Sequence, residues 1–521
     1  MMKSEFEDGP WIRIVSLEIS PPSLKDNTAD TDRLVRGIKK CLDTEEVIID
    51  FSLVKDLPHT LRKYDYRVDA VLFECQNSWR LIDILPFKCK NGVYGLAVDL
   101  GSSTVVVRVM DLLSRKSIHE TAFLNPQLKI GTDILTRIQF ASREGGTDEL
   151  QSLLIDRLNE EIYQLSEKHG ISVDSIMGMS VAGNTTMSHL FLGLNPYWIC
   201  REPYIPVINK PAPIKAAELG LAANPEAPVL VFPNVGSYFG GDLIAGVLAS
   251  GIMSQSEICL LVDVGTNAEV VIGNCDWLMA CAGAAGPALE GGVASMGMMA
   301  GLGVIDKITI DCSSSEFNIR TIGDRPPVGI CGSGLIDLVA QLFLVGMIDV
   351  RAKYVAAKCG DRLTEIDGIK HLIVVSAEDS GTGRPLTLSQ TDVDGLIRSK
   401  AAMYTILTTI TGTVNIPMSE IARFYVAGTF GSFIEPRSAI TIGMLPDLPL
   451  ETYLPLGNTS LKGASMVLLS ARAMKDIFII RDRITYLELN VNQEFMNLFS
   501  AAKFIPHTDT SLFPSVKAGI S

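Results

Sequence analysis

The sequence predicts an α/β protein made of two related halves that follow a small N-terminal α/β domain. Three observations predict this class: an internal repeat, an alternation of apolar strand-like runs with amphipathic helical runs, and a composition typical of compact enzymes. Hydrophobic residues make up 47% of the 521 residues and charged residues 20%, and the chain holds 44 glycines. Because domains usually span about 100–200 residues, we expect several packed units.

The internal repeat is the most informative feature of the chain. The segment LAVDLGSSTVVV (Leu96 to Val107) aligns without a gap to LLVDVGTNAEVV (Leu260 to Val271), 164 residues later. In each copy an apolar run leads to Asp, one apolar residue, Gly and two small polar residues, and a second strand-like run returns. The pattern predicts two β-hairpins with an aspartate and a glycine turn at the tip, and hence two domains of related fold that face each other.

Both turns carry the groups that bind a triphosphate: amides near a glycine, hydroxyl donors, and a carboxylate for the water shell of Mg²⁺. Asp99 and Asp263 are the expected magnesium organisers and, with Ser102 and Ser103, the expected catalytic residues. The other expected phosphate contacts are Gly101, Thr104, Gly265, Thr266 and Asn267. A solvated Asp in an ordinary turn is the alternative for a single copy, but two gapless copies favour a nucleotide site.

A third glycine cluster is placed to hold the rest of a nucleotide. The strand FYVAGTFGSFI ends in a loop that we expect to bind adenosine through Gly428, Thr429, Phe430, Gly431 and Ser432. Taken together, the turns resemble the actin/Hsp70/sugar-kinase superfamily, whose duplicated ATPase core is ribonuclease H-like. In that superfamily equivalent helices cross at a hinge, and the resemblance implies that Gly183, Gly332 and Gly334 allow this crossing. Plain helix-capping glycines are the alternative for each.

The predicted boundaries follow from changes in the pattern. Residues 1–91 are expected to form the small α/β domain, 92–258 the first ATPase subdomain, 259–474 the second, and 475–521 a tail packed on the core. The reset lies near Asn91 and Gly92, where the first hairpin strand begins.

Charge and cysteine usage exclude several classes of function. Forty-five basic and 59 acidic residues give a net charge of −14, and no Lys/Arg-rich run is present, so nucleic acid and anionic membrane are poor partners. No secretory signal or apolar spanning stretch is found, and a cytoplasmic protein is expected. The 10 cysteines are scattered without a CxxC pair, so no iron–sulfur or zinc site is evident. We expect Cys281, Cys331 and His189 to be packing residues.

Longer strings resemble a narrower family, the reductive activators of corrinoid proteins. They are NPQLKIGTDILTRI (Asn125 to Ile138), VAGNTTM, DVGTNAE, AGPALEGG (Ala285 to Gly292), GICGSGLID, DVDGLIRSKAAMY (Asp392 to Tyr404), IGMLPDLP and LGNTSLKGA. The N-terminal strings ISPPSLKDNTADTDRL and LPHTLRKYDYRVDAVL look like that family's middle domain. The resemblance covers nearly all of residues 94–464 and most of the N-terminal domain.

The resemblance implies a specific activity. Such an activator couples hydrolysis of ATP, with Mg²⁺, to the reduction of cob(II)alamin to cob(I)alamin on a corrinoid protein or corrinoid methyltransferase, which supports methyl transfer. Family members carry an iron–sulfur domain that is not evident here. Electrons are expected from a separate ferredoxin-like protein; the alternatives are that the sequence is a fragment, or that the protein has kept the ATPase and lost the reductase role. A homodimer is also expected from the family.

Two other functions remain open from the sequence. One is a small-molecule kinase of the same superfamily, which transfers the γ-phosphate to a metabolite instead of water. The other is a nucleotide-dependent binding or scaffold ATPase without a redox role. Transfer of labelled phosphate would identify the first, and ATP-dependent polymers the second.

Overall fold

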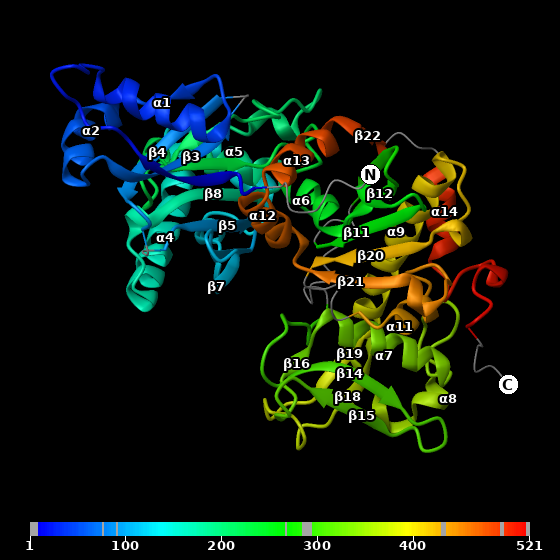
Figure 1. Ribbon diagram of the computed structural model, residues 1–521. Helices are drawn as coiled ribbons and strands as arrows, with labels where there is room; N and C mark the ends of the chain where they lie inside the picture. Colours follow the sequence, from blue (N-terminus) through cyan, green and yellow to red (C-terminus); the bar gives the residue numbers. More distant parts are fainter. Residues whose placement is uncertain are drawn as a thin grey trace. The chain divides into compact units, whose positions relative to one another are not determined.

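The computed structural model describes residues 9–75, 78–89, 92–265, 268–283, 294–428, 434–489 and 494–516 (Figure 1). The chain divides into two compact units. Unit 1 comprises Met1–Ala249 with Ser460–Asp482, and unit 2 comprises Ser250–Thr459 with Arg483–Ser521. Unit 2 therefore interrupts unit 1 along the chain, and each unit has its own sheets and hydrophobic core.

Unit 1 begins with a four-stranded sheet of order β1-β3-β4-β2. Its strands are β1 (Ile12–Glu18), β2 (Val47–Ile48), β3 (Arg67–Cys75) and β4 (Ser78–Pro86). The helices α1 (Asp30–Leu42) and α2 (Phe51–Lys63) each bury residues at i and i+4, the spacing that one face of a helix presents to a sheet: Leu34, Ile38, Leu57 and Leu61. The predicted small α/β domain is present.

The second sheet of unit 1 carries the first repeat. Its order is β7-β6-β5-β8-β10-β9, with β5 and β6 as an antiparallel hairpin and β8 and β10 continuing in parallel from β5. The strands are β5 (Tyr94–Leu100), β6 (Thr104–Asp111), β7 (Lys116–Leu124), β8 (Ile176–Gly183), β9 (Ile214–Lys215) and β10 (Pro228–Val231). Every residue of the central strand β8 is buried, as expected for a parallel strand covered on both faces.

The main sheet of unit 2 carries the second repeat. Its order is β21-β20-β11-β12-β13-β22. The strands are β11 (Cys259–Val264), β12 (Ala268–Gly273), β13 (Leu278–Gly283), β20 (Arg423–Ala427), β21 (Tyr453–Gly457) and β22 (Ile484–Tyr486).

The two main sheets share the topology of five strands and differ in the sixth, because β9 pairs antiparallel with β10 at one edge, whereas β22 pairs parallel with β13 at the other. In both sheets the first three strands form an antiparallel meander, β5-β6-β7 or β11-β12-β13. Two later strands, β8 and β10 or β20 and β21, then add in parallel on the free side of the first strand of that meander. Asp99 lies opposite Ala182 of β8, and Asp263 lies opposite Ala427 of β20, so the two aspartates occupy equivalent positions. The predicted duplication of an ATPase-like core is confirmed.

Unit 1 has six further α-helices besides α1 and α2 among the described residues. They are α3 (Ile134–Ala141), α4 (Gly146–His169), α5 (Thr185–Phe191), α6 (Gly241–Ser250), α12 (Thr459–Leu469) and α13 (Ala471–Arg483). Within the described ranges, no helix is both long and apolar enough to span a membrane.

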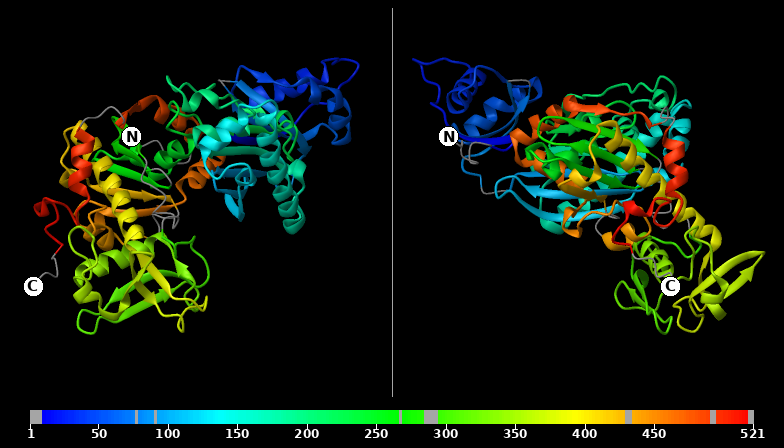
Figure 2. Two further views of the ribbon diagram at one scale, coloured as in Figure 1. Left: turned by 180° about the vertical axis from the view of Figure 1, so that it is seen from behind. Right: turned by 90° about the vertical axis from the view of Figure 1, so that its right-hand side faces the viewer.

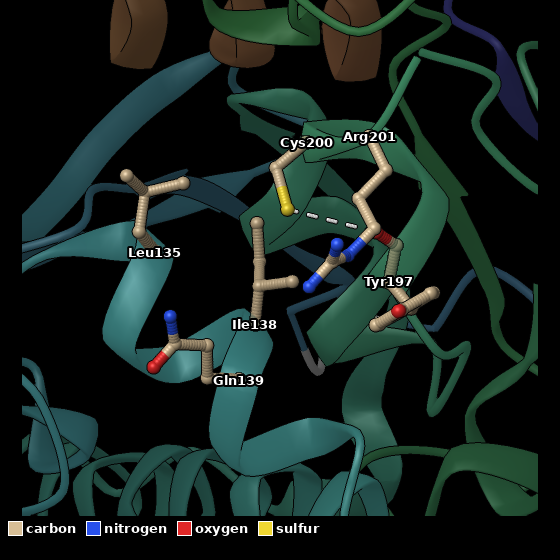
Figure 3. Close-up of a pocket in the computed structure, with 6 residues that line it drawn as sticks. All are labelled: Leu135, Ile138, Gln139, Tyr197, Cys200 and Arg201. Atoms are coloured by element: carbon tan, nitrogen blue, oxygen red, sulfur yellow. Dashed lines mark hydrogen bonds between the residues drawn. The ribbon is translucent and has the colours of Figure 1, made fainter. Parts of the chain in front are cut away.

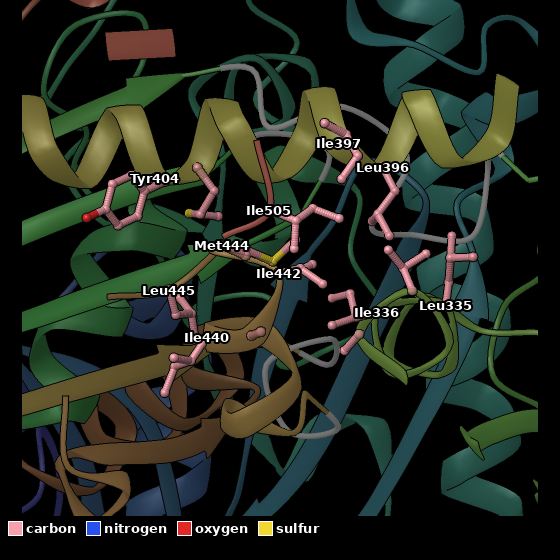
Figure 4. Close-up of a cluster of buried hydrophobic side chains, with 14 of the residues drawn as sticks. Leu335, Ile336, Leu396, Ile397, Tyr404, Ile440, Ile442, Met444, Leu445 and Ile505 are labelled. Carbon is pink, nitrogen blue, oxygen red and sulfur yellow. The ribbon is translucent and has the colours of Figure 1, made fainter. Parts of the chain in front are cut away.

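Unit 2 adds two small sheets and a layer of helices to its main sheet. The strands are β14 (Val304–Ile310), β15 (Phe317–Thr321), β16 (Gly329–Ile330), β17 (Leu363–Ile366), β18 (Ile369–Val375) and β19 (Leu386–Ser389). The helices are α7 (Gly332–Leu344), α8 (Ala356–Cys359), α9 (Gln390–Thr413), α11 (Pro436–Thr441) and α14 (Glu494–Ala502). Helix α9 runs along β12 and β13 (Figure 2). Side chains of α7, α9 and α11 meet in one buried cluster (Figure 4).

The chain after residue 459 departs from the predicted boundaries. Residues 460–474, expected in the second subdomain, belong to unit 1, where a Cβ at Gly463 would lie 2.4 Å from the Ala245 carbonyl oxygen of α6. The Lys475 ammonium also pairs with Glu74 at 2.8 Å. The expected tail is split, because residues from 483 onward join unit 2, where β22 pairs with β13 and α14 packs on α9.

Candidate functional site

The first candidate site is the turn between β5 and β6. Asp99 lies near the end of β5, partly exposed, and Gly101, Ser102 and Ser103 form the turn before Thr104 begins β6. A Cβ at Gly101 would lie 2.3 Å from the Thr104 carbonyl oxygen, so this tight turn requires glycine.

Three donors hold the carbonyl groups of this turn on one side. Asn125 Nδ2 donates to the Gly101 carbonyl at 2.9 Å and Arg137 Nη2 to the Ser102 carbonyl at 2.7 Å. The Asn125 amide donates to the Ser103 carbonyl at 2.8 Å. Because N–H and C=O point in opposite directions across a planar trans peptide, the Ser102 and Ser103 amides face away from Asn125 and Arg137. Successive amides held in this way can bind an anion.

The Ser102 hydroxyl is oriented by the next parallel strand. Asn184 follows β8 and is the N-cap of α5, with Oδ1 accepting from the Met187 amide at 2.9 Å. Its Nδ2 donates to Ser102 Oγ at 3.1 Å. With its oxygen accepting from Asn184, the Ser102 hydroxyl has its own hydrogen to donate to a ligand. A Cβ at Gly183 would lie 2.9 Å from the Leu100 carbonyl oxygen, so this strand end approaches β5 only with glycine.

Helix α5 also contains His189, which is buried. Its Nε2 accepts from the Val207 amide at 3.0 Å, so Nδ1 carries the hydrogen and donates to the Thr185 carbonyl at 2.7 Å. Burial lowers the pKa of His189, which favours this neutral form. The interpretation of His189 as a packing histidine agrees with this geometry.

The second candidate turn follows β11. Asp263 is partly exposed and lies opposite Glu269 of β12. Gly428, at a φ of 83°, directly follows β20, and a Cβ there would lie 2.9 Å from Asp263 Oδ1. The start of the expected adenosine loop is therefore next to Asp263. Gly265 is described, whereas the predicted contacts Thr266, Asn267, Thr429, Phe430, Gly431 and Ser432 lie outside the described residues.

A second repeat accompanies the two aspartates. Val-Ala-Gly ends β8 at residues 181–183 and recurs at residues 426–428, where β20 ends. In both sheets the alanine lies opposite the aspartate and the glycine follows it. The two strings are identical, and each follows one of the two hairpins along the chain, so they are a sequence signal of the same duplication that the hairpin repeat alone had predicted.

The glycines at the start of α7 make a close approach inside unit 2. Gly332 begins the helix, and a Cβ at Gly334 would lie 2.6 Å from the Ile305 carbonyl oxygen. Cys331 is the N-cap residue, is buried, and donates from Sγ to the same carbonyl at 3.3 Å. The helices through which the chain leaves and re-enters unit 1 are α6 and α12, and the hinge role of Gly183, Gly332 and Gly334 stays a prediction.

Two buried ionisable groups lie near these elements. Burial raises the pKa of Asp337 on α7 to about 6, although a hydrogen bond from Ser438 opposes the shift. Within the described part of the chain, Asp337 Oδ1 has no hydrogen-bond partner. Burial also raises the pKa of the Cys281 thiol well above its usual range, which makes this thiol a poor nucleophile, as expected for a packing residue.

A pocket of about 290 Å³ lies beside α3 (Figure 3). It is lined by Leu135, Ile138, Gln139, Tyr197, Cys200 and Arg201. Residues 135, 138 and 139 share one face of the helix at i, i+3 and i+4 spacing, and residue 137 is not on that face. The pocket lining therefore does not include the β5–β6 turn.

The metal chemistry of the two turns suits magnesium bound to a nucleotide. Across the described residues, no three or more His, Cys, Asp and Glu side chains gather to hold a metal ion on their own. Magnesium on ATP takes most of its ligands from phosphate and water, so single carboxylates such as Asp99 and Asp263 suit it as partners of its water shell.

Three family models match successive parts of the chain. Residues 3–90 match the RACo linker region, 94–255 the RACo middle region, and 257–517 the C-terminal domain of RACo, the ASKHA domain. The middle-region resemblance that we had expected in residues 1–91 is thus found in the segment that carries the first repeat.

Individual proteins are similar over most of the chain. The corrinoid activation enzyme RamQ of Eubacterium limosum is 29% identical over 510 residues, 95% of this chain and 83% of that protein. The [Co(II) methylated amine-specific corrinoid protein] reductase of Methanosarcina barkeri is 23% identical over 440 residues, which are 78% of this chain and 76% of that protein. A solved structure of a reductive activator for corrinoid, iron-sulfur protein has a TM-score of 0.89 and 38% identity, covering 99% of this chain and 82% of that one. The chain belongs to the RACo family of reductive activators of corrinoid proteins.

Proposed function

We propose that this protein uses ATP hydrolysis to drive reductive activation of a corrinoid protein. The observation that carries the proposal is the Asp99 turn, where Asn125 and Arg137 donate to the Gly101 and Ser102 carbonyls and the Ser102 and Ser103 amides therefore face the opposite side. Membership of the RACo family supports the corrinoid protein as the partner.

In the proposed reaction, one electron from a reduced ferredoxin-like protein converts cob(II)alamin to cob(I)alamin on the partner, while ATP and water give ADP and phosphate. Asp99 and Asp263 hold the water shell of Mg²⁺, and Ser102 and Ser103 contact the phosphates. Gly101, Thr104, Gly265, Thr266 and Asn267 complete the phosphate contacts. The loop Gly428, Thr429, Phe430, Gly431 and Ser432 binds adenosine.

Catalysis of hydrolysis at such a site is positioning and charge stabilisation, and no protein nucleophile is needed. ATP assists an unfavourable reduction only if the nucleotide states differ in their affinity for the corrinoid partner or its cobalt states. We therefore expect ATP binding and partner binding to be energetically coupled.

The test measures two quantities in one anaerobic reaction: phosphate release, and the absorbance change of cob(II)alamin to cob(I)alamin on a corrinoid methyl carrier with reduced ferredoxin. We expect reduction to require ATP, and the partner to accelerate hydrolysis. Asp99→Asn and Asp263→Asn should each lower hydrolysis by roughly 100-fold. Asp367→Asn, at an exposed turn aspartate far along the chain from both turns, should leave it unchanged.

Two results would contradict the proposal. Hydrolysis that is insensitive to both the partner and the reductant would exclude a role in corrinoid activation. Transfer of the γ-phosphate to a metabolite, followed with labelled ATP, would instead identify a small-molecule kinase.

A further inference from the structure

The segment Asn125–Ile138 folds as a support beneath the phosphate turn. Asn125 begins it, with Oδ1 accepting from the Gln127 amide at 2.9 Å while Nδ2 donates to the Gly101 carbonyl. Gln127 Nε2 then donates to the Leu150 carbonyl of α4 at 2.8 Å. Asp133 caps α3 by accepting from the Thr136 amide at 2.9 Å. This cap fixes the first turn of the helix that presents Arg137.

Arg137 joins this support to the turn. Its Nε donates to the Gly131 carbonyl at 2.9 Å, and its Nη2 donates to the Ser102 carbonyl at 2.7 Å. Its Nη1 lies 3.5 Å from Gln127 Oε1 and 3.4 Å from the Met187 sulfur. All four partners are uncharged, and two of them are backbone carbonyls whose positions the guanidinium fixes.

The positive charge of Arg137 has no carboxylate in ion-pair contact among the described residues. Its side chain is fully buried, and no carboxylate of the described residues forms an ion pair with it. Asp133, the N-cap of the same helix, accepts from the amide and hydroxyl of Thr136, and its charge offsets only part of the effect of burial on Arg137. Burial lowers the pKa of Arg137 to about 10, so the group stays charged near neutral pH. A buried charge without a counter-ion is costly, and a polyphosphate on the turn would supply the missing anion.

We propose that Arg137 is a positioning residue for the phosphates: it holds the Ser102 carbonyl so that the Ser103 amide faces the ligand, and it supplies a positive charge behind the turn. This inference rests on the proposed binding of ATP at the same turn. It assigns Arg137 to the phosphates, because its contacts within unit 1 are to the β5–β6 turn and to the segment that supports this turn.

The two contributions can be separated by substitution. Arg137→Met keeps a long side chain but removes the charge and the donors. Arg137→Lys keeps the charge but replaces the planar fork with a single ammonium group. Arg143→Met is the matched control, because Arg143 is exposed just beyond α3 and stacks on Phe140 without touching the turn.

The experiment compares the affinities of the full chain and these variants for MgATP, MgADP and adenosine by calorimetry. We expect Arg137→Met to bind MgATP and MgADP about 10- to 100-fold more weakly, the loss expected for a hydrogen bond to a charged group, with adenosine affinity unchanged. Arg137→Lys should recover part of the loss, and Arg143→Met should match the unaltered chain.

The outcomes distinguish this inference from the proposed function. If the unaltered chain binds MgATP and Arg137→Met and Arg137→Lys bind it equally well, the inference is overturned and the proposed function stands. An equal loss for adenosine and MgATP would also overturn it, because it indicates a general defect in folding. Should Arg137→Met fail to fold, the ratio of MgATP to adenosine affinity in Arg137→Lys decides. If the unaltered chain binds no MgATP, both proposals fail.

Discussion

Replacement of Gly463 by alanine tests the packing of the two helices through which the chain leaves and re-enters unit 1. Gly463 is buried in α12, and a Cβ there would lie 2.4 Å from the carbonyl oxygen of Ala245 and 2.7 Å from its Cα and Cβ. All three distances are shorter than real Cβ contacts, and two of the three atoms are backbone. No side-chain rotation can relieve the overlap, so α6 and α12 must move apart.

The size of the effect follows from two opposing terms. Inserting a methyl group into a packed helix contact costs about 1–3 kcal/mol, and the backbone overlap places this site toward the upper end. Alanine in place of glycine in a helix interior returns up to about 1 kcal/mol. We therefore expect Gly463→Ala to be destabilised by about 1–2 kcal/mol, or roughly 2–6 °C in the midpoint of thermal unfolding of unit 1.

The assay is thermal unfolding followed by calorimetry, with Gly412→Ala as the matched control. Gly412 lies in α9, is exposed, and has nothing within 4 Å of an added Cβ. The same substitution should therefore leave stability unchanged or raise it there. A Gly463→Ala protein that unfolds at or above the temperature of the unaltered chain would refute the close helix contact.

Two further predictions concern pH. The pKa of Asp337 is raised from 3.8 to about 6, so the folded state binds this proton more tightly than the unfolded chain, and stability falls as the pH rises through that range. Measured by urea unfolding, Asp337→Asn should be more stable than the unaltered chain by about 1–3 kcal/mol near pH 7.5 but not near pH 4. Equal stability of the two proteins at both pH values would contradict this. The pKa of His189 is lowered in the folded state, so the unfolded chain takes up the proton first as the pH falls. The contribution of the neutral ring to folding stability is complete above about pH 6.5 and is lost as the pH falls through the pKa of the folded state. The urea midpoint should thus decline between about pH 7 and pH 5 more steeply in the unaltered chain than in His189→Gln, and parallel curves would count against it.

The hairpins and their duplication could be predicted because their signals are local. An apolar run, an aspartate and a glycine within a few residues specify a strand and its turn, and Asp99 and Asp263 indeed occupy equivalent positions in two sheets that share the topology of five strands. The family strings predicted the family for the same reason. The phosphate, magnesium and adenosine contacts assigned to the residues of the two turns and the loop remain predictions.

Long-range packing could not be predicted in the same way. The apolar face of residues 459–469 indicates a buried helix, but not that it packs in unit 1 on α6. Arginines are mostly exposed, so nothing in the string around Arg137 pointed to a fully buried guanidinium. Its role depends on where the Gly131 and Ser102 carbonyls come together, which only the fold determines.

The return of α12 and α13 to unit 1 also has a consequence for how the protein is made. On the ribosome, residues 1–249 emerge first, but the surface that Leu468 and Lys475 later cover at Gly95 and Glu74 stays open until residue 482 has left the tunnel. At usual translation speeds the intervening segment takes roughly 10–40 s to synthesise. During that interval the nascent chain holds an unfinished unit 1 while unit 2 is being assembled, so α12 and α13, which are translated after most of unit 2, complete the unit that precedes it along the chain.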